Sequence, residues 1–154
     1  MSDAGGPYLF DVGVVALAHA DTPVSDRALS YLQKAIRGDI NAVVPYPVVF
    51  GAHVVLTDYY GFSTAGATEM MLNLMDSNRI DWREDLREAA VRSALERASA
   101  LDVDAWDGYY ADVALAEEVN TVLTLDETLD GLDGVSTTVI LSPAEFAILN
   151  DFLS

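Results

Sequence analysis

The chain has 154 residues, about half of them hydrophobic, which is the length of one ordinary domain with a sizeable core. It contains no cysteine and only two histidines, which excludes disulfides, thiolate catalysis and cysteine-based zinc clusters and disfavours a histidine-rich metal site. The 25 acidic residues against 8 basic ones give a net charge of −17. We interpret this excess as adaptation to a very salty cytoplasm, because the Debye length falls to about 3 Å in molar salt and most self-repulsion disappears.

The same composition bears on location and domain count. No apolar run reaches the roughly 20 residues that a membrane span needs, and no basic region followed by an apolar run opens the chain. We therefore expect a cytoplasmic protein with no membrane contact, folded as a single domain over residues 1–154, with residues 1–7 as a flexible tail. An acidic mimic of nucleic acid is disfavoured, because the acids are scattered along the chain.

The first half of the chain alternates short apolar runs with helical patterns. A buried strand is predicted at Tyr8–Val12, followed by an apolar stretch. Proline near the start and glycine after the end mark the next helix, from Thr22-Pro23 to Gly38. The remaining elements are a strand at Ala42–Val44, a helix from about Pro47 to Tyr60 and a helix capped by Thr64, with Ala67, Met71, Leu74 and Met75 on its apolar face.

The second half continues the alternation. Ser142-Pro143-Ala144-Glu145 is a capping box that opens a last helix ending near Leu153. The other predicted elements are a strand at Arg79–Trp82, a helix at Asp85–Ala98 with Leu86, Ala90 and Ala94 inward, a helix at Ala105–Glu118 capped by Asp104, and strands at Thr121–Leu125 and Thr137–Leu141. Such alternation predicts a three-layer α/β/α sandwich with a mostly parallel central sheet, in which ligands bind beyond the carboxyl ends of the strands.

Three aspartates are expected at that edge of the sheet. Asp11 ends the first strand, Asp126 follows the strand at Thr121–Leu125, and Asp107 lies in the first turn of the preceding helix. Crowded carboxylates repel one another, and a hard cation such as Mg²⁺ or Mn²⁺ removes the repulsion and suits phosphodiester hydrolysis. Each residue taken singly also has a structural explanation, as a turn former or as an acid favoured at a helix N-terminus.

Three segments of the chain resemble the PIN domain family. Leu9–Leu17 is similar to the opening strand and helix of PIN domains, Trp106–Ala114 to their late helix that begins with an aspartate, and Val122–Asp126 to their following strand that ends in Thr-x-Asp. The order, the spacing and the total length agree with the family. With the acid excess, the resemblance points to a PIN protein of a halophilic archaeon.

The resemblance implies a metal-dependent endoribonuclease, possibly the toxin of a VapBC-type toxin–antitoxin pair. In that family an acidic quartet binds Mg²⁺ or Mn²⁺, and the proteins usually form homodimers. Asp11, Asp107 and Asp126 would then be the catalytic and metal-binding residues, with Thr124 as a supporting hydroxyl and Asp112 as an outer acid. The expected partners are an RNA substrate, an antitoxin protein and a second copy of the chain.

The chain departs from the family at its second acid. A glutamate is expected in the helix that reads Pro47-Val48-Val49-Phe50-Gly51-Ala52-His53-Val54, and it is replaced near Gly51. Asp58 lies two turns further on and is a poor substitute, and His53 is either a ligand or a packing residue. The alternative function is therefore a catalytically weakened or inactive PIN-like protein that serves as a binding module.

Two further features bear on function. Arg27, Arg37 and Arg79 are dispersed in the sequence and predict no basic patch, while Tyr109 and Tyr110 either stack on bases or pack in the core or at an interface. Haloacid-dehalogenase-like chemistry is excluded, because Gly13 stands where its second aspartate is needed. A response-regulator receiver is disfavoured, because the only lysine is Lys34.

Overall fold

The central element of the fold is a five-stranded sheet in which every strand pair is parallel. The computed structural model describes residues 5–84, 86–116, 119, 121–125 and 135–154. The strands are β1 (Gly5–Phe10), β2 (Ile40–Pro45), β3 (Asp81–Arg83), β4 (Thr121–Thr124) and β5 (Thr137–Val139), in the order β3-β2-β1-β4-β5. The predicted α/β class is thus confirmed, with β1 at the centre of the sheet.

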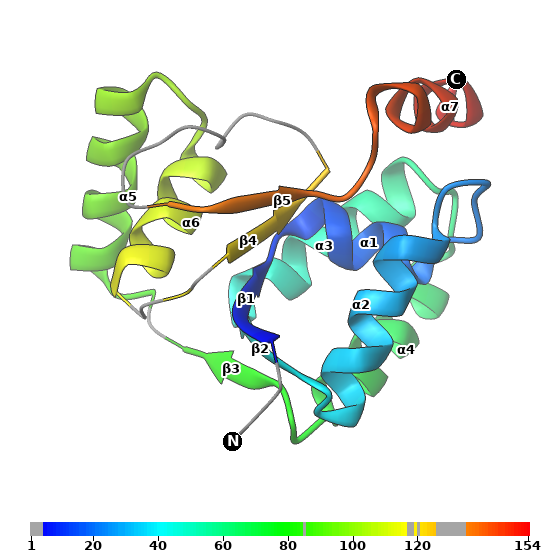
Figure 1. Cartoon of the computed structure of the whole chain (residues 1–154), viewed down its shortest axis with the longest axis horizontal. Coiled ribbons are helices and arrows are strands. Elements are labelled where there is room, and N and C mark those ends of the chain that lie inside the picture. The colour runs from blue at the N-terminus through cyan, green and yellow to red at the C-terminus, as the bar shows by residue number, and fades with distance from the viewer. Residues whose placement is uncertain (1–4, 85, 117–118, 120, 126–134) are drawn as a thin grey trace.

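Helices flank this sheet on both sides and complete the three-layer sandwich. They are α1 (Val12–His19), α2 (Asp26–Arg37), α3 (Tyr46–Asp58), α4 (Thr64–Met75), α5 (Glu88–Leu101), α6 (Ala105–Ala116) and α7 (Pro143–Leu153). Figure 1 shows α5 and α6 paired at the left of the sheet and α1 to α4 grouped at the right. None of the helices in the described part of the chain combines the length and apolarity of a membrane span.

The core is formed around the two central strands. Leu9 and Phe10 of β1 and Val122 and Leu123 of β4 are all fully buried. A continuous apolar run in each strand is what a parallel strand covered by helices on both faces requires, whereas a half-exposed strand would alternate with polar residues. The sheet therefore holds its carboxyl edge rigidly, which fixes the positions of the residues that follow each strand.

The first strand begins and ends earlier than its sequence predicts. Tyr8–Val12 was the expected strand, but β1 runs from Gly5 to Phe10 and pairs with β2 from Gly5↔Ile40 onward. Asp11 ends the strand because its carboxylate accepts the backbone N–H of Val14 and caps α1. Residues 5–7 of the expected tail belong to β1, and residues 1–4 lie outside the described residues.

The start of α2 is a second correction. The Thr22-Pro23 pair was expected to open this helix, but α2 begins at Asp26. The Thr22 and Ser25 hydroxyls are hydrogen-bonded at 2.8 Å, and the Ser25 N–H donates to the Thr22 carbonyl, so residues 22–25 form a turn before the helix, with all but Pro23 buried. Gly38 ends α2 in the left-handed conformation, as predicted.

Two other helix starts are also shifted. Ser63, not Thr64, caps α4 through the Gly66 N–H, which leaves Thr64 as the first helical residue. The helix predicted from Asp85 begins at Glu88, and Leu86, expected to face inward, is 47% exposed. Met75, placed on the apolar face of α4, is likewise 38% exposed.

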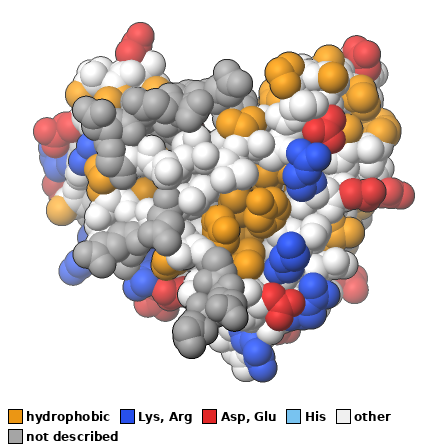
Figure 2. Space-filling view, in the orientation of Figure 1, with side chains coloured by type: hydrophobic (Ala, Val, Ile, Leu, Met, Phe, Trp, Pro, Cys, Tyr) orange, Lys and Arg blue, Asp and Glu red, His pale blue; other side chains and the backbone are white. Residues whose placement is uncertain are grey.

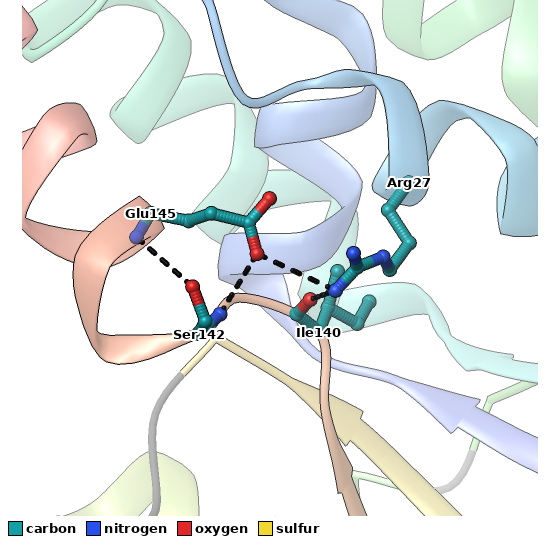
Figure 3. A network of polar contacts seen from close by, with 4 residues as sticks. All are labelled: Arg27, Ile140, Ser142 and Glu145. Carbon is teal, nitrogen blue, oxygen red and sulfur yellow. Dashed lines mark hydrogen bonds and ion pairs between the residues drawn. The ribbon is translucent and has the colours of Figure 1, made fainter.

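The C-terminal capping box is confirmed and is tied to α2. Ser142 accepts the Glu145 N–H, while the Glu145 carboxylate accepts the Ser142 N–H at 2.9 Å. Figure 3 shows Arg27 of α2 reaching both the Ile140 carbonyl and the Glu145 carboxylate. The Ser142 backbone N–H, helped by the Ser142 hydroxyl and by Arg27, holds the pKa of Glu145 below its ordinary value. The contact fixes α7 beside the amino end of α2.

Candidate active site

Asp11 lies at the carboxyl edge of the sheet, at its centre. It directly follows β1, and its backbone N–H donates to the Leu123 carbonyl of β4 at 3.3 Å. Its half-buried carboxylate accepts the Val14 N–H at 2.8 Å, so the side chain is held over the first turn of α1. A carboxylate fixed at this edge is where parallel α/β sheets bind ligands.

Tyr110 connects the start of α1 to α6. Its phenol oxygen accepts the backbone N–H of Val12, the residue after Asp11, at 2.9 Å. The ring is 3% exposed, and Trp106 stacks on it with ring centroids 5.7 Å apart. The same turn of α6 carries Asp107, whose N–H is capped by the Asp104 carboxylate at 2.8 Å.

Two of the expected acids contribute to the electrostatics of this phenol. Burial is the largest cause that raises the pKa of Tyr110 well above its ordinary value, and the negative charge of Asp11 is the next. Hydrogen bonding from Val12 lowers this pKa, while the charges of Asp107 and Asp104 raise it further. The Val12 hydrogen bond and the position of Asp107 three residues before Tyr110 bring the backbones of Asp11 and Asp107 to the same part of the molecule.

Thr124 lies beside Asp11 on the neighbouring strand. Phe10 pairs with Leu123, so the next residues along the two parallel strands, Asp11 and Thr124, are aligned. Thr124 is 6% exposed, and its carbonyl accepts the Ile140 N–H. Asp126, the third expected ligand, lies outside the described residues.

Asp112 and His53 lie in other environments. Asp112 forms an ion pair with Arg97 of α5, and its position is about 140° around the helix from Asp107 at 100° per residue. The ring of His53 contacts the Thr68 hydroxyl at 3.0 Å and bridges α3 to α4. Asp112 is thus oriented toward Arg97, and His53 has a packing role between two helices.

The position of the missing glutamate is filled by apolar side chains. A Cβ at Gly51 would lie 2.5 Å from Cγ2 of Val12 and 3.1 Å from Cζ2 of Trp106. Val12 is adjacent to Asp11, and Trp106 is adjacent to Asp107, so Gly51 does face the candidate site. A side chain at this position would first have to displace Val12 and would also crowd Trp106.

The donor set suits a hard cation. Asp11, Asp107 and Thr124 offer carboxylate and hydroxyl oxygens, the ligands that Mg²⁺ and Mn²⁺ prefer. Within the part of the chain that the structure describes, no three acidic or histidine side chains are grouped closely enough to hold a metal ion. The trio that includes Asp126 therefore stays a prediction.

Sequence reasoning missed the central role of Tyr110. Its predicted core packing is confirmed for both tyrosines, with Tyr109 6% and Tyr110 3% exposed. The available signal was the spacing: Tyr110 follows Asp107 by three residues, which places both on one face of α6. A tyrosine one helical turn after a candidate ligand can position it.

Comparisons with known proteins leave the family unassigned. A scan against models of protein families found no match, and a search of curated proteins found no significant similarity.

Proposed function

We propose that this chain is a divalent-metal-dependent endoribonuclease of the PIN type that hydrolyses RNA phosphodiester bonds. The observation that supports the proposal is the hydrogen bond from the Val12 N–H to the Tyr110 phenol at 2.9 Å, which joins the residue after Asp11 to the helix that carries Asp107. With Asp126, Asp11 and Asp107 would form the carboxylate set that holds Mg²⁺ or Mn²⁺. The bound cation would supply an activated water and neutralise charge on the phosphate.

The residues around the site would position these acids. Tyr110 is protonated at neutral pH, as any tyrosine is, so its hydroxyl is a neutral donor beside the start of α1. Thr124 would add a hydroxyl at the sheet edge, and Trp106 would exclude water from the side on which it stacks. Asp112, proposed as an outer acid, also forms an ion pair with Arg97 of α5.

Cleavage of a labelled RNA in molar KCl with Mn²⁺ tests the proposal. Asp11→Asn keeps an acceptor for the Val14 N–H but removes a charge, so we expect cleavage to fall at least about 100-fold, as for loss of one preorganised electrostatic group. The matched control is Asp76→Asn, the same change at an exposed position that ends α4. Equal cleavage by the wild type and Asp11→Asn would remove this residue from the site.

The second candidate function is a catalytically inactive binding module. The packing of Val12 and Trp106 against Gly51 favours it, because a carboxylate side chain at this position would have to displace them. Calorimetric titration of Mn²⁺ separates the two functions. The nuclease proposal expects binding that weakens in Asp11→Asn and in Asp126→Asn, whereas a purely structural role for these acids expects no heat in either the wild type or the variants.

The toxin role, an antitoxin partner and a homodimer belong to the same proposal. All three rest on the resemblance to PIN domains. One observation supports the proposed homodimer: Phe50 and Val54, one turn apart on α3, are 80% and 52% exposed. Large apolar side chains this exposed on one helix face are typical of a surface that another protein covers.

A further inference from the structure

An open apolar hollow lies where α5 and α6 meet the start of α3. It has a volume of about 240 Å³, and its lining includes Pro47, Leu86, Val91, Leu95 and Trp106. Leu86 and Leu95 are each about half exposed, so these apolar side chains face solvent. None of the described residues that line the hollow carries a charge.

A ridge of apolar side chains runs along α3 beside the hollow. Pro47, Phe50 and Val54 follow one another at spacings of three and four residues, which places them on one face of the helix. Phe50 is the most exposed large apolar side chain in the described part of the chain. A Cβ on Gly51, the neighbouring position on this face, would lie 3.1 Å from Cζ2 of Trp106. Because Pro47 belongs to both, the ridge and the hollow form one continuous surface, which we call the α3–α6 surface.

The net charge of −17 limits what can cover the α3–α6 surface. Figure 2 shows acidic side chains spread around the outline of the molecule. Because like charges that face each other across an interface are unfavourable, two copies of this chain can associate only where neither presents unpaired acids. A partner that recognised this protein by charge would be basic, and it would gain little from a surface that lacks carboxylates. The absence of charge in the described lining therefore fits a second copy of the chain.

The apolar side chains exposed on α4 lie among acids instead. Leu72 is 58% exposed, with Glu69 three residues before it and Asp76 four residues after it on the same face of the helix. Along the α3 ridge the first acid is Asp58, one turn beyond the last apolar side chain. Of these two surfaces, the one on α3 and α6 is the one on which acidic copies can meet without burying unpaired carboxylates.

The α3–α6 surface is also complementary to itself in shape. A protruding ridge and an open hollow lie side by side on one molecule, so a two-fold axis between them would place the ridge of each copy in the hollow of the other. Phe50 and Trp106 are aromatic, and aromatic side chains are enriched in the well-packed centres of interfaces. Near the hollow, Glu88 of α5 pairs with Arg92 at 2.7 Å, so this pair adds no net charge.

We propose that the α3–α6 surface is the interface of a symmetric homodimer, in which Phe50 of each copy enters the hollow beside Trp106 of the other. This inference deepens the homodimer of the proposed function, and it rests on that function for the expectation that two copies associate. The observations that assign the surface do not involve the metal site. Screening of the remaining acids in molar salt would let the apolar contact decide the association.

Sedimentation velocity over a concentration series in molar KCl measures the dissociation constant of the dimer. In Phe50→Gln we expect about 100-fold weaker association, because a two-fold interface loses the side chain twice and each loss of an aromatic anchor costs about tenfold. Leu95→Gln changes the wall of the hollow and should weaken the dimer as well. Both side chains are exposed, so neither variant should unfold the chain, and circular dichroism checks this.

Phe152→Gln is the matched control. It is the same substitution at another exposed phenylalanine, on α7, next to Asp151. We expect its dissociation constant to stay within about twofold of the wild-type value, as for a surface substitution outside the interface. If Phe50→Gln and Phe152→Gln weaken the dimer equally, or if Leu95→Gln leaves it unchanged, the assigned interface is wrong.

The effect of salt tests the identity of the occupant. Raising KCl from 0.5 M to 2 M should tighten the wild-type dimer, because repulsion between two acidic copies is screened while apolar contacts are not weakened. Association that weakens with KCl would contradict an interface between like-charged copies. A wild type that stays monomeric over the whole concentration series would overturn the proposal and leave the surface to a different protein.

These outcomes are separable from those of the nuclease proposal. Asp11→Asn should form the dimer with wild-type affinity while losing cleavage, because Asp11 lies outside the α3–α6 surface. A wild type that cleaves RNA as a monomer would retain the nuclease and refute the interface. A dimer that is lost in Phe50→Gln, from a wild type without cleavage under any metal, would retain the interface and refute the nuclease.

Discussion

The phenol of Tyr110 is the residue on which the geometry of the candidate site depends. It accepts the Val12 N–H and so links the start of α1 to α6. After burial, the negative charges of Asp11 and Asp107 also raise the pKa of this phenol. A buried donor left without its partner costs about 1–3 kcal/mol. The same contact therefore contributes to stability and holds the start of α1, next to Asp11, against α6.

Tyr110→Phe tests this contact through the pH dependence of stability. The unfolded chain ionises this phenol near pH 10, while the folded protein keeps it protonated because its pKa is raised. The free energy of unfolding must then fall as pH rises above about 10, by up to about 1.4 kcal/mol per pH unit. In Tyr110→Phe we expect lower stability at pH 8 and a shallower alkaline fall.

Urea unfolding in molar KCl at pH 8 and at pH 10.5 measures both effects. Burial also raises the pKa of Tyr60, to about 12, so part of the alkaline fall should persist in the variant. Tyr59→Phe, at a ring that is 64% exposed, is the control. If the free energy of unfolding falls equally with pH in the wild type and in Tyr110→Phe, the raised pKa of Tyr110 is contradicted.

Among the helices, the close approach of α5 and α6 sets the position of Asp107. A Cβ at Gly108 would lie 2.8 Å from the Ala98 Cβ and would also meet the Ala94 carbonyl. Ala94 and Ala98 are buried on the facing side of α5, so small residues on both helices bring the backbones together. This packing holds the first turn of α6, which carries Asp107, against α5.

Gly108→Ala should therefore destabilise the protein, although alanine ordinarily favours a helix. We expect a loss of about 1–3 kcal/mol, the usual cost of overpacking. Gly66→Ala is the control, because its Cβ would meet only the Ser63 hydroxyl at 3.1 Å and a helix gains about 0.5–1 kcal/mol from the change. Urea unfolding compares the two variants, and equal stabilities would refute the close approach.

At the scale of the whole molecule, the net charge of −17 is the dominant property. The ion pairs are mostly exposed, as at Arg92–Glu88 with side chains 72% and 80% exposed, and such pairs offset little of the repulsion. Shortening the Debye length from about 10 Å to about 3 Å removes most long-range repulsion between exposed acids. Stability should thus depend strongly on salt.

Thermal unfolding in 0.1 M and 2 M KCl tests this dependence. We expect Tm to rise with KCl, by roughly 4–8 °C for each 2 kcal/mol of repulsion removed. Sorbitol at matched osmolality separates screening from solute exclusion, which also stabilises folded proteins. A Tm that is flat or falls with KCl would contradict salt adaptation.

Local signals in the sequence predicted most elements of the fold. The capping box at Ser142, the glycine that ends α2 and the Asp104 cap are all confirmed, because each depends on residues within one turn of the helix end. The predicted start of α2 at Thr22-Pro23 was wrong. The turn that precedes this helix is stabilised by the burial of Thr22 and Ser25, which no local pattern reveals.

For the candidate site, the sequence predicted its place at the carboxyl edge of the sheet. The tertiary structure decided which side chains lie around Asp11. Asp11 could be placed beforehand, because parallel strands end at a common edge. The packing of Val12 and Trp106 against Gly51 and the Tyr110 hydrogen bond to Val12 could not be predicted, because each joins elements far apart in the chain.

The sequence by itself determined the α/β class and the parallel sheet, since these follow from periodicity and short-range caps. It also determined the net negative charge, which follows from composition and makes stability depend on salt. Only the tertiary structure decided which side chains meet. Long-range contacts depend on how helices pack over the sheet, and small residues such as Gly51 and Gly108 set those distances without leaving a periodic signal.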